Sequence, residues 1–526
     1  MSKHHKKDKL VKLLAKYNHR REQGISQRKC SEELSIPRKT IEDWQTRREE
    51  IPLAKEIIDF FESPVGFGFL NSLLISLQLT MTQIGGYGIR SVSRVLELTG
   101  LSYFVGSSYE CLRQRGIEME NRICDFADKY NNELSSSMPH KEITVAQDET
   151  FHPKACLVAI EPVSNFIIME RYADNCKAET WNNCFEEATS NLNVSFIQST
   201  SDEGSSILSH VEQDLKVHHS PDLFHIKNDI FRGINPKLSG MEAKSIKDLD
   251  ELYKKYAKSK EDKDLKDRIS KKIAEVKNVK SNHIKVLEAE NIIGNAYHPY
   301  DLTTAKANTH AKLESTLAGA FNTINKVANL INLRETGKDL IAKAKAMIPS
   351  MTSTLDFYFD TINNMLKSLG IKGSKNKLMK EFLIPSAYLD RCIRKAKNAD
   401  SKRAIKSTVK MLQAKLSKEK CWISLSKEVR EKLVKYSFRC ADVFQRSSSC
   451  VEGRNGYLSL RHHGLHNISD RKLKVLTTIH NYFIRRPDGT TAAQRFYEQE
   501  HGDIFEYLIE KMTCPARSRK SVLKVP

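Results

Sequence analysis

Three acidic residues stand where they could hold divalent cations. Asp148 lies in an expected strand, Asp202 directly follows another, and Glu452 lies in an expected helix far along the chain. Carboxylate oxygens are ligands that Mg²⁺ prefers, and two such ions stabilise the attacking and the leaving oxygen in phosphodiester cleavage. We therefore expect Asp148 to bridge two Mg²⁺ ions, for which Mn²⁺ can substitute, while Asp202 and Glu452 each hold one of them.

The two aspartates belong to a segment whose residue pattern changes from helical to strand periodicity at Ile143. Alternation along its first strand puts Asp148 on the face opposite Val145 and turns Glu149 away from Asp148. In this order of elements, the strands that carry the two aspartates are neighbours and their ends can converge. Strands are expected over residues 143–148, 154–161, 166–172, 194–200 and 218–224, and helices over 178–192 and 203–215.

Each acidic candidate has a competing interpretation. Asp148 could cap a loop of an ordinary α/β core, and Asp202 would be a good N-cap for a helix that begins at Glu203. Glu452 could be an exposed helix carboxylate paired with Arg454 or with nearby basic side chains. The metal assignment requires that the intervening residues fold back and bring Glu452 beside Asp148.

The N-terminal region, residues 1–52, has the rhythm of a helix-turn-helix. Apolar residues such as Cys30 and Ile36 would line its interior, and Pro37 suits the first turn of the second helix, where its missing N–H costs nothing. A generic small helical bundle with a basic face is the alternative, because the turn lacks its usual glycine. The second helix would present side chains suited to phosphates and base edges, namely Arg38, Lys39, Thr40 and Arg47.

The rest of the chain divides into mainly helical regions around the strands. Residues 53–140 form a second helical region, either DNA-binding or a linker, and residues 141–233 carry the strands. Apolar residues at helical spacing over 234–440 predict an all-helical region with an antiparallel hairpin within 247–290. Residues 441–500 carry Glu452, and residues 501–526 form a basic tail that we expect to be disordered beyond Pro515.

The composition indicates an anionic partner. Lys and Arg number 85 against 65 Asp and Glu in 526 residues, a formal net charge of +20, and such a surplus attracts phosphate backbones. We recognise no apolar run of transmembrane length and no signal-peptide core, so we expect no membrane association and a cytoplasmic location. The 11 cysteines are scattered without CxxC pairs, which argues against a zinc ribbon or a disulfide framework.

Four short motifs carry a resemblance to a known family. They are Asp148 in QDETF, Asp202 in TSDEGSS, His225 in DLFHIKND and Glu452 in SSSCVEGRNG. Together they resemble the ribonuclease H-like catalytic core of DDE-superfamily transposases encoded by bacterial insertion sequences. An all-helical insertion interrupts this core in several such families. The resemblance covers residues 143–228 and 443–495 and implies that His225 and Arg454 neighbour the active site.

The resemblance implies an α/β ribonuclease H-like core interrupted by an all-helical insertion and preceded by a helix-turn-helix. It implies that the protein binds the terminal inverted repeats of its own element, hydrolyses double-stranded DNA there and joins the 3′-hydroxyls to target DNA. The protein would act as a homo-oligomer, at least a dimer, and associate with the bacterial nucleoid. We expect Arg454, Arg461 and His462 to contact phosphates near the scissile bond. A DNA-binding regulator without catalysis and a ribonuclease H-like nuclease without strand joining are the alternatives.

Overall fold

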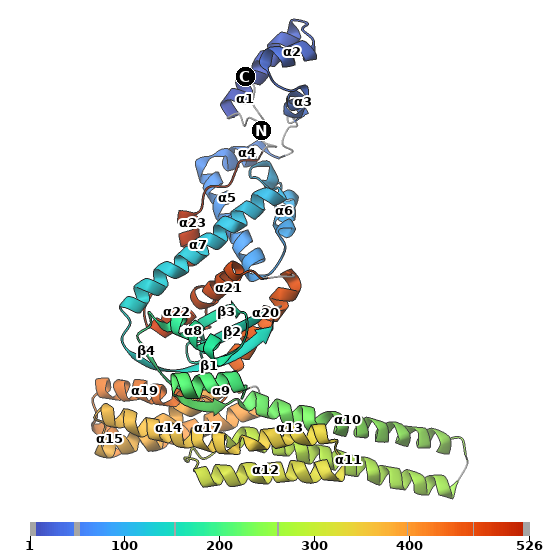
Figure 1. Cartoon of the computed structure of the whole chain (residues 1–526), viewed down its shortest axis with the longest axis vertical. Helices are drawn as coiled ribbons and strands as arrows, with labels where there is room; N and C mark the ends of the chain where they lie inside the picture. The colour runs from blue at the N-terminus through green and yellow to red at the C-terminus, as the bar shows by residue number, and fades with distance from the viewer. Residues whose placement is uncertain are drawn as a thin grey trace. The chain divides into compact units, whose positions relative to one another are not determined.

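The computed structural model describes residues 7–46, 53–151, 154–259, 262–396, 398–465 and 468–518. The chain forms two compact units, one of residues 1–135 and 460–526 and the other of residues 136–459. Their boundary in the sequence falls within the helix α20 (Ser449–Leu465). Among the described residues helices predominate and the strands form one small sheet (Figure 1). This confirms the mostly helical chain with a small α/β part that the sequence predicts.

The sheet belongs to the second unit and has the strand order β3-β2-β1-β4-β5. Its strands are β1 (Lys141–Phe151), β2 (Ala155–Glu161), β3 (Phe166–Ala173), β4 (Val194–Ser201) and β5 (His218–Pro221). β1, β2 and β3 form antiparallel pairs, whereas β4 runs parallel to β1 and β5 parallel to β4. β1 therefore lies in the centre of a mixed sheet. Each of the five expected strands overlaps an observed one.

The two faces of this sheet carry different side chains. Val145 of β1 packs in a hydrophobic layer with Trp181 of α8 (Ala178–Thr189). Because side chains alternate along a strand, Asp148 lies on the opposite face, which confirms the expected separation from Val145. There Asp148 is directly opposite Val158 of β2, and Val158 is directly opposite Glu170 of β3. These three residues form one row across the sheet.

The helix expected over 203–215 begins two residues later than predicted and is irregular. It consists of α9 (Ser205–Ser209) and the π-helical segment η3 (His210–Leu215). Gly204, and not Asp202, occupies the N-cap position of α9. The backbone geometry thus contradicts the interpretation of Asp202 as the N-cap of a helix that begins at Glu203.

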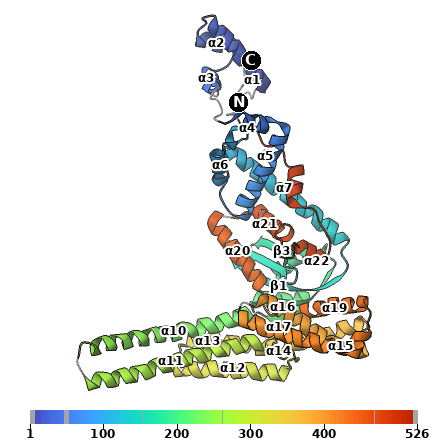
Figure 2. The ribbon, with the colours of Figure 1, turned by 180° about the vertical axis from the view of Figure 1, so that it is seen from behind.

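The residues between β5 and α20 form a helical insertion (Figures 1 and 2). The pair α10 and α11 packs as an antiparallel hairpin that projects beyond the other helices, which confirms the expected hairpin. Because α10 follows β5 directly, the insertion begins at Leu223 and not at residue 234. Its helices are α10 (Leu223–Tyr256), α11 (Lys263–Ala296), α12 (His310–Leu330), α13 (Glu335–Ala346), α14 (Ile348–Ser368), α15 (Gly373–Leu378), η4 (Met379–Leu383), α16 (Ile384–Lys395), α17 (Ala399–Leu416), α18 (Lys420–Ser424) and α19 (Lys427–Asp442).

The insertion has its own hydrophobic core, whose centre is aromatic. Tyr358 makes edge contacts with the rings of Tyr300 and Phe444, and Tyr388 contacts the same two rings. Edge contacts between aromatic rings add to the free energy that burial alone provides. The helices from α10 to α19 are therefore packed as a folded body rather than a solvated linker.

The N-terminal helices α1 (Lys7–Glu22), α2 (Gln27–Leu34) and α3 (Arg38–Thr46) surround a small core. That core consists of Leu14, Tyr17, Cys30, Ile36 and Ile41. Ser35, in the turn between α2 and α3, has a φ of 52°, a left-handed conformation that usually favours glycine. The turn therefore adopts this conformation without the glycine that is usual there. Helical spacing would also turn Trp44 toward this core, but its side chain, like the residue Arg47, lies outside what the structure describes.

The remaining helices of the first unit that precede the sheet form a second core. They are α4 (Lys55–Glu62), α5 (Pro64–Leu77), η1 (Gln78–Ile84), α6 (Ile89–Leu98), η2 (Leu101–Tyr103) and α7 (Tyr109–Ser136). Contrary to expectation, Pro64–Ile84 is long and apolar enough to cross a membrane by length and composition. Its residues Leu70 and Leu74 are buried in the core of this unit. Less than half of this apolar stretch is buried, and a core helix can share its length and composition.

The C-terminal residues also fold within the first unit. They contain α21 (Asp470–Tyr482), α22 (Ala492–Tyr497) and α23 (Ile504–Lys511). Arg517 pairs with Val105 in an antiparallel bridge, and its guanidinium lies 3.7 Å from the centre of the Phe67 ring. The expected disorder beyond Pro515 is therefore wrong as far as Ser518. Residues 460–500, expected in the catalytic core, instead belong to the unit of the N-terminal helices.

We expect His218 to make the stability of the second unit depend on pH. His218 stacks on Phe357, with 4.4 Å between the ring centres, and its burial lowers its pKa to about 4. Unfolding restores a value near 6.5, so the unfolded chain binds an extra proton and stability falls as the pH drops from 6.5 to 4. In His218→Gln, up to about 3 kcal/mol of this loss should disappear. Urea denaturation at pH 7 and pH 4.5 measures the difference, and equal losses in both proteins would contradict the prediction.

Candidate metal centre

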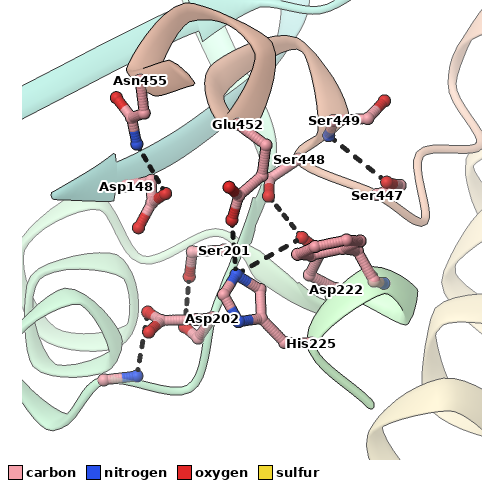
Figure 3. Close-up of polar contacts among 12 residues, drawn as sticks. Asp148, Ser201, Asp202, Asp222, His225, Ser447, Ser448, Ser449, Glu452 and Asn455 are labelled. Atoms are coloured by element: carbon pink, nitrogen blue, oxygen red, sulfur yellow. Dashed lines mark hydrogen bonds and ion pairs between the residues drawn. The ribbon is translucent and has the colours of Figure 1, made fainter. Parts of the chain in front are cut away.

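Two carboxylates and one imidazole from distant parts of the second unit meet at one place (Figure 3). One ligand atom each from Asp148, His225 and Glu452 lies within 4.8 Å of the other two. Asp148 comes from β1, His225 from the first turn of α10 and Glu452 from the first turn of α20. The fold thus places Glu452 beside Asp148, although the whole insertion separates them in sequence.

Asp148 is held by two hydrogen bonds. The backbone N–H of Glu149 donates to its Oδ1 and the side-chain amide of Asn455 donates to its Oδ2, both at 2.8 Å. Glu149 itself points to the other face of the sheet, where its Oε1 accepts a hydrogen bond from the Trp181 indole at 3.0 Å. Glu149 therefore does not compete with Asp148 for a cation at this centre, as strand alternation predicts.

His225 forms an ion pair with Glu452, with 2.9 Å between Nε2 and Oε1. The carboxylate of Asp222 lies 3.8 Å from the same nitrogen. The bond to Glu452 raises the pKa of His225 to about 9, and the nearby charges of Asp222 and Asp202 act in the same direction against the effect of burial. At neutral pH His225 is therefore a cation that partly neutralises the acidic centre.

Asp202 lies at the edge of this centre. It directly follows β4, is half-buried, and its Oδ1 accepts a hydrogen bond from the backbone N–H of Gly204 at 3.2 Å. Its ligand atoms are not among those that meet within 4.8 Å, yet its charge acts on both Asp148 and His225. Asp202 is thus close enough to interact electrostatically with Asp148 and His225, but it lies apart from the carboxylates of Asp148 and Glu452 (Figure 3).

The pKa of Asp148 is raised to about 7, mainly by burial. The backbone N–H of Glu149 and the charge of His225 oppose this shift, whereas the negative charges of Glu452 and Asp202 add to it. A carboxyl group that resists ionisation in this way would be stabilised as an anion by a positive ion. The electrostatics of the site therefore favour a bound cation. Sequence reasoning could not give this result, because the shift arises from burial and from contacts across the fold.

Hydrogen bonds beside the centre connect the first and the last residues of the insertion. The Ser448 hydroxyl donates to the carboxylate of Asp222, and the backbone N–H of Leu223 donates to the carbonyl of Arg446 at 3.0 Å. Asp222 is also the N-cap of α10, accepting from the N–H of Phe224 at 2.7 Å. These bonds hold the two ends of the insertion together. His225 and Glu452 follow directly from these ends.

Sequence reasoning gave no role to Asp222 or Asn455, both of which are buried at the centre. Both lie inside motifs that were already identified, Asp222 in DLFHIKND and Asn455 in SSSCVEGRNG. An Asp directly before an expected helix is a signal for an N-cap. Neither motif indicates, however, which distant side chain the residue would contact.

The predicted phosphate contacts fall in different environments. Arg454 is buried, and its guanidinium makes two hydrogen bonds to the carboxylate of Glu170, at 2.7 and 2.6 Å. Arg461 is also buried and donates to the backbone carbonyls of Gln83 and Ile84 within the first unit. Both guanidinium groups are thus used inside the fold, which corrects the expectation that they face DNA. His462 is half-buried.

The predicted DNA-binding residues of the N-terminal helices have a different setting. Arg38 and Lys39 are exposed on α3 and Thr40 is half-buried, whereas Arg47 lies outside the described residues. Arg38 lies 3.9 Å from Glu42, a distance at which an exposed ion pair contributes little. The charged groups of Arg38 and Lys39 are therefore accessible to a polyanion.

A comparison with known protein families finds a match over part of the chain. The model of a family of unknown function, DUF6399, matches residues 379–524. This stretch includes Glu452 but neither of the aspartates. No curated protein and no solved structure matches the chain.

We expect Glu452→Gln to lower the pKa of His225 markedly from about 9. The pair with Glu452 is the largest cause of the raised value, and burial, which remains, acts in the opposite direction. Because the pair needs a protonated imidazole, its stabilisation is complete below pH 6.5 and is lost as the pH rises through 9. NMR titration of ¹³C-labelled histidine, with His225→Gln to assign the signal, measures the change. A value that stays near 9 in Glu452→Gln would contradict the geometry.

Proposed function

We propose that this protein is a DDE transposase that cleaves and joins DNA in a reaction that depends on Mg²⁺. The observation that carries the proposal is the meeting of Asp148 and Glu452, two carboxylates that the long insertion separates in sequence, within 4.8 Å. The ion pair of His225 with Glu452 accounts for one acid, whereas this centre holds a second carboxylate, Asp148, and places a third, Asp202, nearby. Such an excess of acidic groups around one point is typical of a cation site.

The fold around the centre supports the proposal. The mixed sheet has its antiparallel strands first and its parallel strands last, with Asp148 on the central strand and Asp202 after the neighbouring one. A helix after the insertion supplies Glu452. This agrees with what a ribonuclease H-like core with an all-helical insertion requires. In our proposal the core comprises residues 141–222 and 443–459.

The donor set fits hard divalent cations. Ligands of one Mg²⁺ or Mn²⁺ ion lie about 3 to 4 Å apart, so small side-chain rotations within the 4.8 Å cluster suffice. Bound ions would stabilise charge on the attacking and leaving oxygens of the phosphodiester. Asp148 is the candidate bridging ligand, Glu452 and Asp202 flank it, and His225 balances the charge of Glu452 when no ion is bound.

DNA recognition is assigned to the N-terminal helices. α3 follows the turn at Ser35 as the second helix of a helix-turn-helix does, and it exposes Arg38 and Lys39. The formal charge of +20 agrees with a large polyanionic partner. We propose the terminal inverted repeats of the element as the bound sequence, target DNA as the second substrate, and a homo-oligomer as the active form.

Catalysis should depend on Asp148 and Glu452 but not on Glu149. With Mg²⁺ and DNA that carries the sequence flanking the gene, we expect Asp148→Asn and Glu452→Gln to lower the rate of strand joining by at least about 100-fold, or about 2.7 kcal/mol. Glu149→Gln is the matched control, because it changes the adjacent carboxylate on the opposite face. Gel assays of the joined products measure the rate.

The products of the same assay separate the alternatives. Joining that persists in Asp148→Asn would refute the proposal. Cleavage by the wild type without joining would indicate a ribonuclease H-like nuclease, and sequence-specific binding without cleavage would indicate a regulator.

The double variant Arg38→Ala, Lys39→Ala should bind DNA more weakly and with a smaller salt dependence. Each lost phosphate contact lowers the slope of log affinity against log salt by about 1, so the slope should fall by up to about 2. Lys16→Ala, an exposed lysine on α1, is the control. Fluorescence anisotropy with a duplex from the element end between 50 and 200 mM salt measures both slopes. Equal slopes would place the DNA contact elsewhere.

A further inference from the structure

The helix that carries Glu452 is fastened to the sheet by a buried ion pair. Arg454 donates from Nε and Nη2 to the two carboxylate oxygens of Glu170, at 2.7 and 2.6 Å. The Glu170 side chain is fully buried and that of Arg454 is 5% exposed. Two parallel hydrogen bonds between a guanidinium and a carboxylate fix both the distance and the angle between the two groups, and so between α20 and β3.

Two residues of the sheet, at the two ends of a row across three strands, contact consecutive residues of this helix. Asp148, Val158 and Glu170 lie directly opposite one another on β1, β2 and β3. Neighbouring strands are about 4.8 Å apart, so the ends of the row lie about 10 Å apart. Arg454 contacts Glu170 at one end, and Asn455 contacts Asp148 at the other. The start of α20 therefore lies across three strands.

The helical period relates these contacts to Glu452. At about 100° per residue, Asn455 is on nearly the same side of α20 as Glu452, whereas Arg454 projects from almost the opposite side. The helix is thus held from two sides within one turn of Glu452. A shift or rotation of α20 that moved Glu452 away from Asp148 would also break the bonds to Glu170.

We propose that Arg454 is a positioning residue that, through its pair with Glu170, sets the place of Glu452 in the metal centre. This inference rests on the proposed function, since it concerns the cation site formed by Asp148 and Glu452. It gives Arg454 a role different from the phosphate contact that the sequence predicts, because the buried guanidinium already binds a carboxylate. The role is indirect, and Arg454 touches none of the three acidic residues of the centre in the contacts described.

A second bidentate pair of the same unit, which is half-buried, provides a control. Arg391 of α16 donates from Nε and Nη2 to Asp442 of α19, both at 2.7 Å. This pair joins two helices of the insertion. Arg391→Lys and Arg454→Lys both keep the positive charge and lose the double hydrogen bond. The two substitutions therefore make the same chemical change, at a half-buried pair far from Glu452 and at the buried pair beside it.

Binding of Mn²⁺ alone to the full chain, followed by electron paramagnetic resonance of the free ion, tests the inference without an activity assay. Partners that orient metal ligands typically contribute 10- to 100-fold to affinity. We expect Arg454→Lys to raise the Mn²⁺ concentration for half-saturation by about tenfold or more, and Arg391→Lys to change it less than about twofold. Glu170→Gln reaches the same contact from β3 and should behave like Arg454→Lys. Thermal unfolding of each variant identifies any that fails to fold.

The outcomes distinguish the inference from the proposed function. If Arg454→Lys and Glu170→Gln fold and bind Mn²⁺ as Arg391→Lys does, the positioning role is refuted while the metal centre stands. If the wild type and Asp148→Asn bind Mn²⁺ equally, the metal centre and the proposed function are refuted together. Weak binding confined to Arg454→Lys, Glu170→Gln and the variants of the centre supports the inference.

Discussion

The repulsion between acidic side chains is the constraint on which the central part of this structure depends. Asp148 and Glu452 share one half-buried place with Asp202 nearby, and burial makes their charges interact strongly. Without a bound cation, the protein counters this repulsion with the protonated imidazole of His225, the amide of Asn455 and one backbone N–H. Such an arrangement favours the binding of positive charge, which agrees with the proposed metal centre.

The long insertion does not interfere with this arrangement because its two ends are tied together. The bonds between Ser448 and Asp222, and between Leu223 and Arg446, close it at the base. The entropic cost of closing a loop rises only slowly with its length, and the insertion also has its own folded core. The ends of the insertion deliver His225 and Glu452 to the centre. The insertion can therefore be long without moving either residue.

The arginines near Glu452 illustrate how a motif can be identified and its role misjudged. From the sequence, a basic residue beside a catalytic acid is most simply interpreted as a contact to a phosphate. In the folded protein, Arg454 contacts Glu170 and Arg461 contacts backbone carbonyls. Their positions along α20 place both side chains on sides of the helix that are buried. Helical phase is predictable, whereas the surface that each side of the helix meets is not.

The amino-acid sequence alone predicts the strands, the hairpin and the separation of Asp148 from Val145 and Glu149, because these follow from local periodicity. It also identified the acidic candidates by their residue types and motifs. Only the tertiary structure decided that Glu452 meets Asp148 while Asp202 stands slightly apart, and that residues 460–518 fold with the N-terminal unit. It alone gave roles to Asp222 and Asn455. These outcomes depend on contacts between residues far apart in the chain, and local patterns carry no information about which distant surfaces will pack together.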